Sequence, residues 1–246
     1  MALTDYKTAL VTGASGGIGE ACVRALTARG INVFAAARRR EKLDALASET
    51  GCQPIILDVQ DKDAIYAQLE NREIDILINN AGLGRGFESL FTADPNDIET
   101  TLQTNVIGAA HVIRATVAGM VARNRGHVVN IGSVAGLYPI QSSVYGSSKG
   151  AIHLMSQNLR IELKGTRIRV TEICPGRVET NFFNVAVNDP EKSAKAFAGF
   201  EALQAGDISD AIVYALDTPW RVNIGTIELS PTEQSFGGMQ ITPAPE

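Results

Sequence analysis

Cysteine is scarce in this chain of 246 residues, and positive charge is not in excess. The three cysteines, Cys22, Cys52 and Cys174, show no C-x-x-C spacing and cannot all pair with one another. We therefore expect reduced thiols and no disulfide framework. The three histidines have no metal-ligand spacing either, so no metal site is expected. The formal net charge of −5 argues against a nucleic-acid-binding surface, which would be basic.

Long hydrophobic runs are absent as well. No stretch reaches the roughly 20 apolar residues of a membrane span, and the start, MALTDYKTALVTG, has no basic region followed by an apolar segment. These two absences predict a cytoplasmic protein without a membrane partner. Hydrophobic residues still make up 45% of the chain, which is ordinary globular usage. Because no Pro/Gly/Ser-rich linker divides them, residues 1–246 are expected to form one domain.

Short apolar segments alternate with helix-length stretches along the chain. Nearly continuous apolar runs are typical of strands buried on both faces of a parallel sheet. Their alternation with helices predicts right-handed crossovers and a doubly wound (Rossmann-type) α/β fold, with a three-layer parallel sheet of about seven strands. The expected strands are Thr8–Thr12, Asn32–Ala37, Pro54–Asp58, Ile74–Asn79, His127–Ser133, Ile168–Cys174 and Gly225–Leu229. The expected helices are Ile18–Arg29, Arg39–Ser48, Asp63–Glu70, Pro95–Arg123, Tyr145–Lys164 and Ile208–Asp217.

Two segments lack this alternation. Residues 177–206 mix Asn, Asp, Pro, Lys and Phe, which predicts a long loop with short helices, of the kind that covers a substrate site. Residues 237–246 carry two Pro and two Gly and are expected to form an extended tail.

A glycine-rich turn follows the first predicted strand. Residues 12–19 read TGASGGIG and contain four glycines. Glycine lets backbone N–H groups approach an anion, and the start of the following helix adds a partial positive charge. We interpret the turn as a phosphate-binding loop of a dinucleotide site; the alternative is a tight turn that needs glycine for its backbone alone.

The end of the second predicted strand indicates which dinucleotide would bind. An NAD site would carry Asp or Glu there, whereas this chain has Arg38, Arg39 and Arg40. Guanidinium groups are permanently charged and can bind the oxygens of a 2′-phosphate in pairs. The run could also be a solvated helix start. The missing acid favours NADP(H), with Arg38 as the first candidate, Arg39 as the second and Arg40 at the surface.

Three polar residues follow at spacings that suit proton transfer. Ser133 ends the fifth predicted strand, where side chains face the ligand cleft of a doubly wound sheet. Tyr145 and Lys149 are four residues apart and should share one face of a helix. A neighbouring ammonium lowers the pKa of a tyrosine from about 10 and lets it act as general acid and base. Taken alone, the Tyr145–Lys149 pair could be an exposed helix start.

Taken together, these motifs resemble the short-chain dehydrogenase/reductase family over nearly the whole chain. They occur in the family's order and near its spacings. No catalytic position departs from the family pattern, which argues against an inactive member. The motifs are TGASGGIG at 12–19, LDV at 57–59, NNAG at 79–82, TNVIG around Asn105, IGS ending at Ser133, YGSSK at 145–149 and PGRVET at 175–180.

The resemblance implies a role for each matching residue. Tyr145 would exchange a proton with the substrate oxygen while a hydride moves between the nicotinamide and the carbonyl carbon. Ser133 would hydrogen-bond that oxygen, Lys149 would hold the nicotinamide ribose, and Asn105 would support a water that relays the proton. The residues expected to contact NADP(H) are Gly13, Ser15, Gly17, Ile18, Gly19, Arg38, Arg39, Asp58, Val59, Asn80, Ala81, Gly82, Tyr145, Lys149, Pro175, Gly176, Val178 and Thr180.

A narrower resemblance is to NADP-dependent 3-hydroxy acid dehydrogenases, carried by residues 82–90, 127–149 and 227–240. That branch acts on serine, allo-threonine and 3-hydroxypropionate, and similar enzymes reduce sulfoacetaldehyde. We therefore expect a small anionic carbonyl or hydroxy substrate. The alternatives are a general ketone, aldehyde or ketoacyl reductase of the same family and, from another class, a regulator that binds NADP without turnover.

Two arginines are candidates for binding such an anion. Arg85 follows the fourth predicted strand and Arg177 follows a Pro-Gly pair, so both should lie near the substrate mouth. A guanidinium there suits a carboxylate or sulfonate, although each arginine could equally be a surface residue. Ser133 and Tyr145 would hold the reacting oxygen. Other residues that could line the mouth, or simply pack there, are Gln141, Phe87, Phe182 and Phe183.

The predicted helix Pro95–Arg123 carries more apolar surface than one sheet face needs. Ala109, Ala110 and Val112 lie beyond its core stripe, which indicates a partner subunit. The family resemblance implies a homodimer or homotetramer. The expected core stripe is Ile98, Leu102, Val106, Ile113 and Val117.

Overall fold

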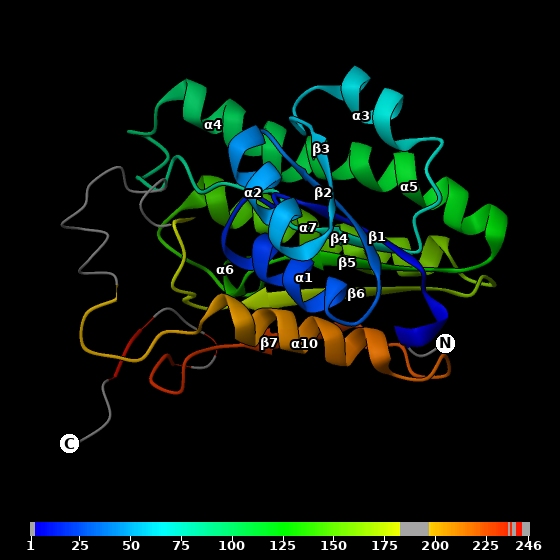
Figure 1. Ribbon diagram of the computed structural model, residues 1–246. Coiled ribbons are helices and arrows are strands. Elements are labelled where there is room, and N and C mark those ends of the chain that lie inside the picture. Colours follow the sequence, from blue (N-terminus) through cyan, green and yellow to red (C-terminus); the bar gives the residue numbers. More distant parts are fainter. Residues whose placement is uncertain (1–2, 183–196, 236, 238–239, 243–246) are drawn as a thin grey trace.

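The computed structural model describes residues 3–182, 197–235, 237 and 240–242. One parallel sheet runs through its centre with helices on both sides, which gives three layers (Figure 1). Its seven strands lie in the order β3-β2-β1-β4-β5-β6-β7, and every neighbouring pair is parallel. The predicted doubly wound fold and its strand number are therefore confirmed.

The strand order places a ligand site. The chain builds outward from β1 to β2 and β3, and then returns to add β4 on the other side of β1. Doubly wound sheets bind ligands at this switch, outside the carboxyl ends of the strands. The strands are β1 (Thr8–Thr12), β2 (Asn32–Ala37), β3 (Gln53–Ile56), β4 (Ile76–Asn79), β5 (Gly126–Ile131), β6 (Ile168–Pro175) and β7 (Thr226–Leu229).

Each face of the sheet is covered by helices that bury an apolar core against it (Figure 1). Because β4, β5 and β6 are buried at every position, their sequences lack polar alternation. The helices on one face are α1 (Gly17–Thr27), α2 (Arg40–Thr50) and α10 (Ala205–Asp217). Those on the other are α3 (Lys62–Leu69), α5 (Ala109–Arg123) and α7 (Ser143–Glu162).

A continuous helical stretch of 29 residues, Pro95–Arg123, packs on the second face. It consists of α4 (Pro95–Leu102), a π-helical segment η2 (Gln103–Gly108) and α5. By length and composition alone this stretch could cross a membrane, but half of its most apolar part is buried inside the protein. Core helices meet the same criterion, and polar residues interrupt this stretch, so it is not a continuous apolar run.

The π-helical segment changes which side chains of this stretch are buried. Ala109 and Val112, predicted to lie beyond the core stripe, are 5% and 0% exposed. Leu102, predicted to be core, is 37% exposed. A π-helical turn holds more residues than an α-helical turn, so η2 rotates α5 relative to α4. The large apolar side chains exposed on α4, η2 and α5 are therefore Leu102, Ile107 and Val121.

Two strands end earlier than the sequence predicts. β5 ends at Ile131, because Ser133 caps the short helix α6 (Val134–Leu137) and its Oγ accepts a hydrogen bond from Ala135 N at 3.1 Å. β3 ends at Ile56, and Asp58 follows in a turn in which its Oδ1 accepts from Gln60 N at 3.0 Å. Both side chains still lie at the carboxyl edge of the sheet.

The predicted loop 177–206 and tail 237–246 are described in part, since residues 183–196, 238–239 and 243–246 lie outside the described residues. The two ends of the loop meet, because Val178 and Leu203 form a parallel bridge. In the tail, Ile241 forms an antiparallel bridge with Gln234. The described part of the tail therefore pairs with the segment just before it, and the prediction of an extended tail stays a prediction.

Candidate active site

The glycine-rich turn between β1 and α1 is tightly folded. Gly13 has a φ of 67°, which favours glycine. A Cβ on Gly19 would collide with Gly13 O, and a Cβ on Gly13 would lie 2.8 Å from Asn80 Nδ2. Asn80 also donates a hydrogen bond to Thr12 O at 2.9 Å. Because α1 begins without a side-chain cap, its first N–H groups are placed for an anion such as a pyrophosphate.

The arginines after β2 lie beside this turn. Arg39 donates to Ser15 Oγ through Nε and Nη2, at 3.1 and 2.9 Å, and to Ser15 O at 2.8 Å. Arg38 lies 3.6 Å from Asp58, and both side chains are well exposed. Arg40 is exposed at the start of α2. The second-ranked candidate, Arg39, is therefore the arginine that contacts the turn directly.

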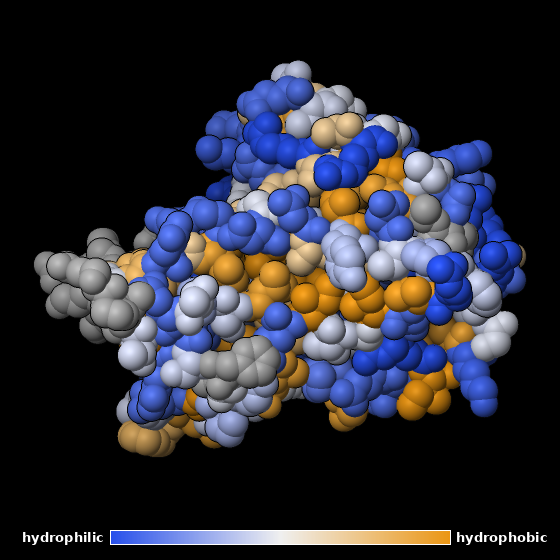
Figure 2. Space-filling model, turned by 90° about the horizontal axis from the view of Figure 1, so that it is seen from below, coloured by the Kyte–Doolittle hydropathy of each residue, from blue (hydrophilic) through white to orange (hydrophobic). Residues whose placement is uncertain are grey.

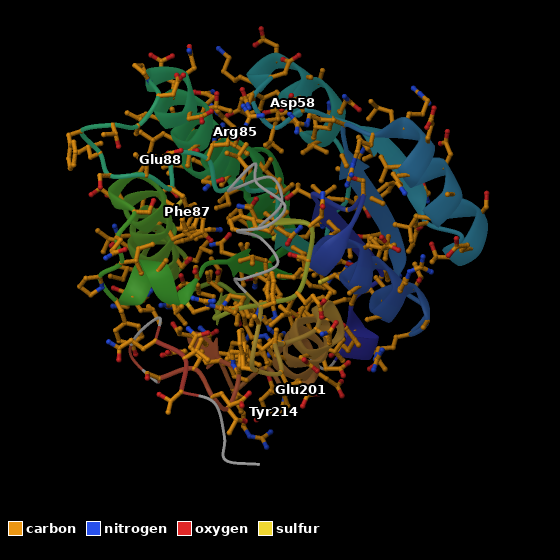
Figure 3. All side chains as sticks on the ribbon, turned by 90° about the vertical axis from the view of Figure 1, so that its left-hand side faces the viewer. Asp58, Arg85, Phe87, Glu88, Glu201 and Tyr214 are labelled. Carbon is orange, nitrogen blue, oxygen red and sulfur yellow. The ribbon has the colours of Figure 1, made fainter. Side chains whose placement is uncertain are left out.

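A pocket lies at the carboxyl edge of the sheet, where Ser133, Tyr145 and Lys149 meet. Figure 3 looks onto this edge and shows Asp58, Arg85 and Phe87 on one side of it, with Glu201 and Tyr214 on the other. The other predicted residues that line the pocket are Ile18, Asn80, Gly82, Pro175, Gly176, Arg177, Val178, Thr180 and Phe182, together with Phe87. Predicted cofactor residues outside its lining are Gly13, Ser15, Gly17, Gly19, Arg38, Arg39, Asp58, Val59 and Ala81.

The pocket and the glycine-rich turn are joined by the segment after β6. A Cβ on Gly17 would lie 3.2 Å from Thr180 Cγ2. The turn, Thr180 and the pocket therefore form one continuous site. The turn is its anion-binding end, and the pocket with Ser133, Tyr145 and Lys149 is its reacting end. This arrangement fits a dinucleotide: the backbone excludes side chains at the glycines, and polar side chains gather at the pocket.

Tyr145 lies in the first turn of α7, where Ser142 Oγ accepts a hydrogen bond from its backbone N at 3.3 Å. Its ring stacks on Phe87, with centroids 5.0 Å apart, and lies at 5.5 Å from the ring of Phe182. Its hydroxyl hydrogen-bonds to Ser133. These contacts bury the side chain and hold its hydroxyl beside Ser133 in the pocket.

Lys149 and Asn105 are also buried, and each is fixed by a hydrogen bond. Lys149 Nζ donates to Ile131 O at 2.9 Å. Asn105, in η2, donates to Leu83 O at 2.8 Å and to Ser148 Oγ at 3.0 Å. π-Helical segments often occur at functional sites; here the segment holds Asn105 beside the loop that follows β4.

The predicted lowering of the tyrosine pKa is not what this structure shows. Burial raises the pKa of Tyr145 to about 12, although the hydrogen bond with Ser133 opposes that shift. Burial also lowers the pKa of Lys149 to about 8. Lys149 Nζ lies 5.9 Å from the centroid of the Tyr145 ring and points to a backbone carbonyl. The loss of solvation therefore outweighs the attraction between the two groups.

Besides Ser133 and Tyr145, three polar residues are candidates for binding substrate: Arg177, Arg85 and Gln141. Arg177 lines the pocket, and its guanidinium lies 5.8 Å from the centroid of the Phe200 ring. Arg85 lies 3.5 Å from Asp97 and is half exposed, and Gln141 is exposed; neither lines the pocket. The structure therefore brings Arg177 to the pocket and leaves Arg85 and Gln141 outside its lining.

Several residues of the site carry no sequence signal of their own. Phe87 and Phe182, aromatic loop residues of a kind that more often only packs, line the pocket, whereas Phe183 lies outside the described residues. Gln234 was not predicted at all. It is 3% exposed, and its Oε1 accepts a hydrogen bond from Arg177 N at 3.0 Å. Gln234 does not itself line the pocket. The lining residues that the sequence did not indicate are Ile131, Gly132, Val134, Ala135 and Ile140.

One cluster of possible metal ligands lies below the pocket. His153, Glu172 and Cys174 have donor atoms within 4.8 Å of one another. His153 Nδ1 and Glu172 Oε2 are only 2.6 Å apart, however. Two neighbouring ligands of a tetrahedral zinc, bound at about 2.0–2.1 Å, would be roughly 3.3 Å apart. This pair therefore has the geometry of a direct hydrogen bond.

The doubly wound sheet, the glycine-rich turn and the pocket with its tyrosine and lysine define a dinucleotide-binding α/β protein. The family model described as short chain dehydrogenase matches residues 7–191. This chain belongs to that family, as its motifs suggested.

Individual relatives share most of their length with this chain. The NADP-dependent 3-hydroxy acid dehydrogenase YdfG of Salmonella typhi is 42% identical over 242 residues, which cover 94% of this chain and 98% of that protein. The solved structure described as the closed form of serine dehydrogenase complexed with NADP+ is 40% identical. It has a TM-score of 0.91 and covers 96% of this chain and 100% of its own. Serine dehydrogenase from Escherichia coli is 38% identical, with a TM-score of 0.81 and coverages of 93% and 100%.

Proposed function

We propose that this chain is an NADP(H)-dependent oxidoreductase that interconverts a small hydroxy compound and its carbonyl form. The main support is that Ser133, Tyr145 and Lys149 line the same pocket, at the edge of the sheet where the glycine-rich turn lies. Bound NADP(H) would supply or accept the hydride. The similarity to NADP-dependent dehydrogenases over nearly the whole chain supports the same reaction class.

In this proposal Tyr145 is the proton donor and acceptor. A raised pKa keeps its hydroxyl protonated at neutral pH, ready to protonate the oxygen of a carbonyl that is being reduced. Ser133, hydrogen-bonded to Tyr145, would share that oxygen. Lys149 would hold the nicotinamide ribose and favour the phenolate once the proton has left. Asn105 would support the water that resupplies the proton.

Arg38 and Arg39 would select NADP(H) over NAD(H). Arg39 is already fixed at Ser15 in the turn, and Arg38 is exposed near Asp58. A 2′-phosphate between the two guanidinium groups would receive charge-assisted hydrogen bonds. Asp58 and Val59 would border the adenine, and Asn80, Ala81, Gly82, Pro175, Gly176, Val178 and Thr180 would line the rest of the cofactor path.

The preferred substrate is a short anionic one, of the 3-hydroxy acid, semialdehyde or sulfoacetaldehyde type. Most of the pocket lining is apolar, and Arg177 is the arginine among its lining residues. Partial burial lowers the pKa of Arg177, because a buried guanidinium loses hydration. A carboxylate or sulfonate in the pocket would accept charge-assisted hydrogen bonds from this guanidinium.

Substrate profiling tests this proposal. NADPH oxidation would be followed by absorbance with malonic semialdehyde, succinic semialdehyde, sulfoacetaldehyde, an acetoacetyl thioester and neutral aldehydes and ketones of matched size. The charged small substrates should react with kcat/KM at least about tenfold higher. Arg177→Met should remove that preference, whereas Arg85→Met, the matched control outside the pocket, should retain it. Equal rates with neutral ketones would instead support a general carbonyl reductase.

The proposed enzyme is a homodimer or homotetramer in the cytoplasm. Exposed apolar side chains on α4, η2, α5 and α7 (Leu102, Ile107, Val121, Leu154 and Ile161) would support a homodimer or homotetramer in the cytoplasm. A second apolar band crosses the face that carries α10 and β7 (Figure 2). There β7 is the edge strand, with Ile227 and Leu229 partly buried. Light scattering coupled to gel filtration would test the assembly, and a monomer at micromolar concentration would contradict it.

A further inference from the structure

The carboxyl group of Glu172 is buried beneath the pocket. Among the described residues, the hydrogen bonds of Ser133, Tyr145 and Lys149 go to other partners. Glu172 is on β6 and is 0% exposed. Its Oε2 lies 2.6 Å from Nδ1 of His153, within hydrogen-bonding distance. His153 is on α7 and is partly exposed, and Gln157 contacts its other ring nitrogen at 2.8 Å.

The carboxyl group of Glu172 lies directly against the backbone that forms the floor of the pocket. Ile131, Gly132 and Ser133 are consecutive residues of that floor. A Cβ on Gly132 would collide with Glu172 Oε1, so the carboxylate fills the space that a side chain there would occupy. Lys149 Nζ is bonded to the carbonyl of the preceding residue, Ile131. The negative group is therefore separated from the buried lysine by the backbone of the floor.

The same helix face connects the two sites. Tyr145, Lys149 and His153 follow one another at intervals of four residues on α7 and so share one face. Charges in such a buried setting interact more strongly than in water. Burial lowers the pKa of Lys149, and Cys174 and then Glu172 oppose that shift.

The groups that face Glu172 from the surrounding elements are few among the described residues. His153 and Lys149 approach from α7, and Cys174 is its neighbour on β6. Burial raises the pKa of the Cys174 thiol, so it stays neutral. On β7, Glu228 accepts a hydrogen bond from Tyr138 at 2.9 Å.

We propose that Glu172, held by His153, is a positioning residue for proton transfer: its charge beneath Gly132 favours the protonated forms of Lys149 and Tyr145. This inference rests on the proposed function, in which those two residues handle the proton. A negative charge acts in the same direction on both groups, because it stabilises an ammonium and destabilises a phenolate. Removing that charge should therefore move every ionisation of the site toward lower pH.

The test is the isosteric variant Glu172→Gln. We expect the pH midpoints of kcat/KM, and of NADPH binding followed by its fluorescence, to move toward acid by about half to one pH unit. The binding measurement does not depend on turnover. If both profiles coincide with those of the wild-type protein, the inference is overturned, whatever the change in absolute rate.

A matched control distinguishes the effect of the Glu172 charge on the pocket from the general effect of removing a buried carboxylate. Asp75 is also buried, and its carboxylate lies 3.0 Å from Arg125 at the opposite edge of the sheet. Asp75→Asn should leave the pH midpoints in place even if it lowers stability. A shift equal to that of Glu172→Gln would contradict a local effect.

A second pair of variants covers the case in which Glu172→Gln does not fold. His153 is partly exposed, so His153→Lys and His153→Gln should both fold. The lysine places a permanent positive charge beside Glu172, and we expect its pH midpoints to lie on the acid side of those of the glutamine variant. Identical midpoints would overturn the inference. Full turnover by Tyr145→Phe would instead refute the proposed function itself.

Discussion

The two edges of the parallel sheet use similar side chains differently. At the amino edge, Asp75 accepts a hydrogen bond from Lys7 N at 2.8 Å and lies 3.0 Å from Arg125. Arg169 donates to the carbonyl oxygens of Thr218 and Leu216, at 3.0 and 2.8 Å. At the carboxyl edge, the polar side chains face a pocket instead.

This difference separates groups that stabilise the fold from groups that can do chemistry. The charged groups of the amino edge find their partners within the chain. At the carboxyl edge, Tyr145 and Lys149 line a pocket, and burial raises the pKa of Tyr145 and lowers that of Lys149. Burial also shifts the pKa values of Tyr6 and His127 at the amino edge, so the pocket is what distinguishes the carboxyl edge. Changes at the amino edge should therefore reduce stability and spare turnover, and changes at the carboxyl edge should do the reverse.

The largest expected effect is on turnover. Tyr145→Phe removes the proton donor and should lower kcat by about 10²–10⁴-fold, while NADPH binding and the melting temperature change little. Steady-state kinetics and NADPH fluorescence would measure both. Tyr138→Phe is the matched control, because Tyr138 lies outside the pocket lining and bonds to Glu228. Unchanged turnover by Tyr145→Phe would rule out its role as proton donor.

At the opposite edge, Asp75→Ala should reduce the free energy of unfolding by about 3 kcal/mol, because Arg125 and the N–H of Lys7 lose a buried partner. Urea denaturation would measure the loss. The kcat of the folded fraction should remain that of the wild-type protein. A stable Asp75→Ala protein with reduced kcat would contradict the division between the edges.

Lys149→Met tests the cost of a buried charge. The pKa of Lys149 falls from 10.5 to about 8 on folding, because burial disfavours the ammonium. The free energy of unfolding is therefore reduced below about pH 8 and recovers as the pH rises through 10.5, above which the lysine is neutral in both states. At pH 7 the variant should be more stable by about 2 kcal/mol and inactive, with an advantage that shrinks above pH 8. A destabilised variant at pH 7 would contradict this.

The smallest expected effect concerns cofactor choice. Arg38→Asp should lower the ratio of kcat/KM for NADPH over NADH by about tenfold or more, since an acid repels the 2′-phosphate and can accept from a ribose hydroxyl. Arg39→Asp should do the same and also release Ser15. Arg40→Asp, at the exposed start of α2, is the control and should leave the ratio unchanged.

Much of this architecture could be predicted from local sequence. The strands are recognisable because parallel strands buried on both faces have continuous apolar runs, and the glycine-rich turn marks the carboxyl end of β1. The four-residue spacing of Tyr145 and Lys149 places both on one face of α7.

Other features depend on contacts between distant segments. The π-helical segment η2 shifts the phase of a long helix, which exposes Leu102 and could not be inferred from a regular period. The sign of the Tyr145 pKa shift follows from Phe87 and Phe182 closing over the ring, and spacing along α7 holds no information about them. Gln234, which follows β7, contacts Arg177 although the two residues are 57 positions apart in the sequence.

The close approach of Glu172 to Gly132 has an evolutionary consequence. The two positions are far apart in sequence, yet the carboxylate at one occupies the volume of a side chain at the other. Neither can change freely: a larger residue at 132 displaces the carboxylate, and a shorter residue at 172 leaves a void below the floor. Across homologous chains the two positions should therefore vary as a correlated pair, with His153 as the third member.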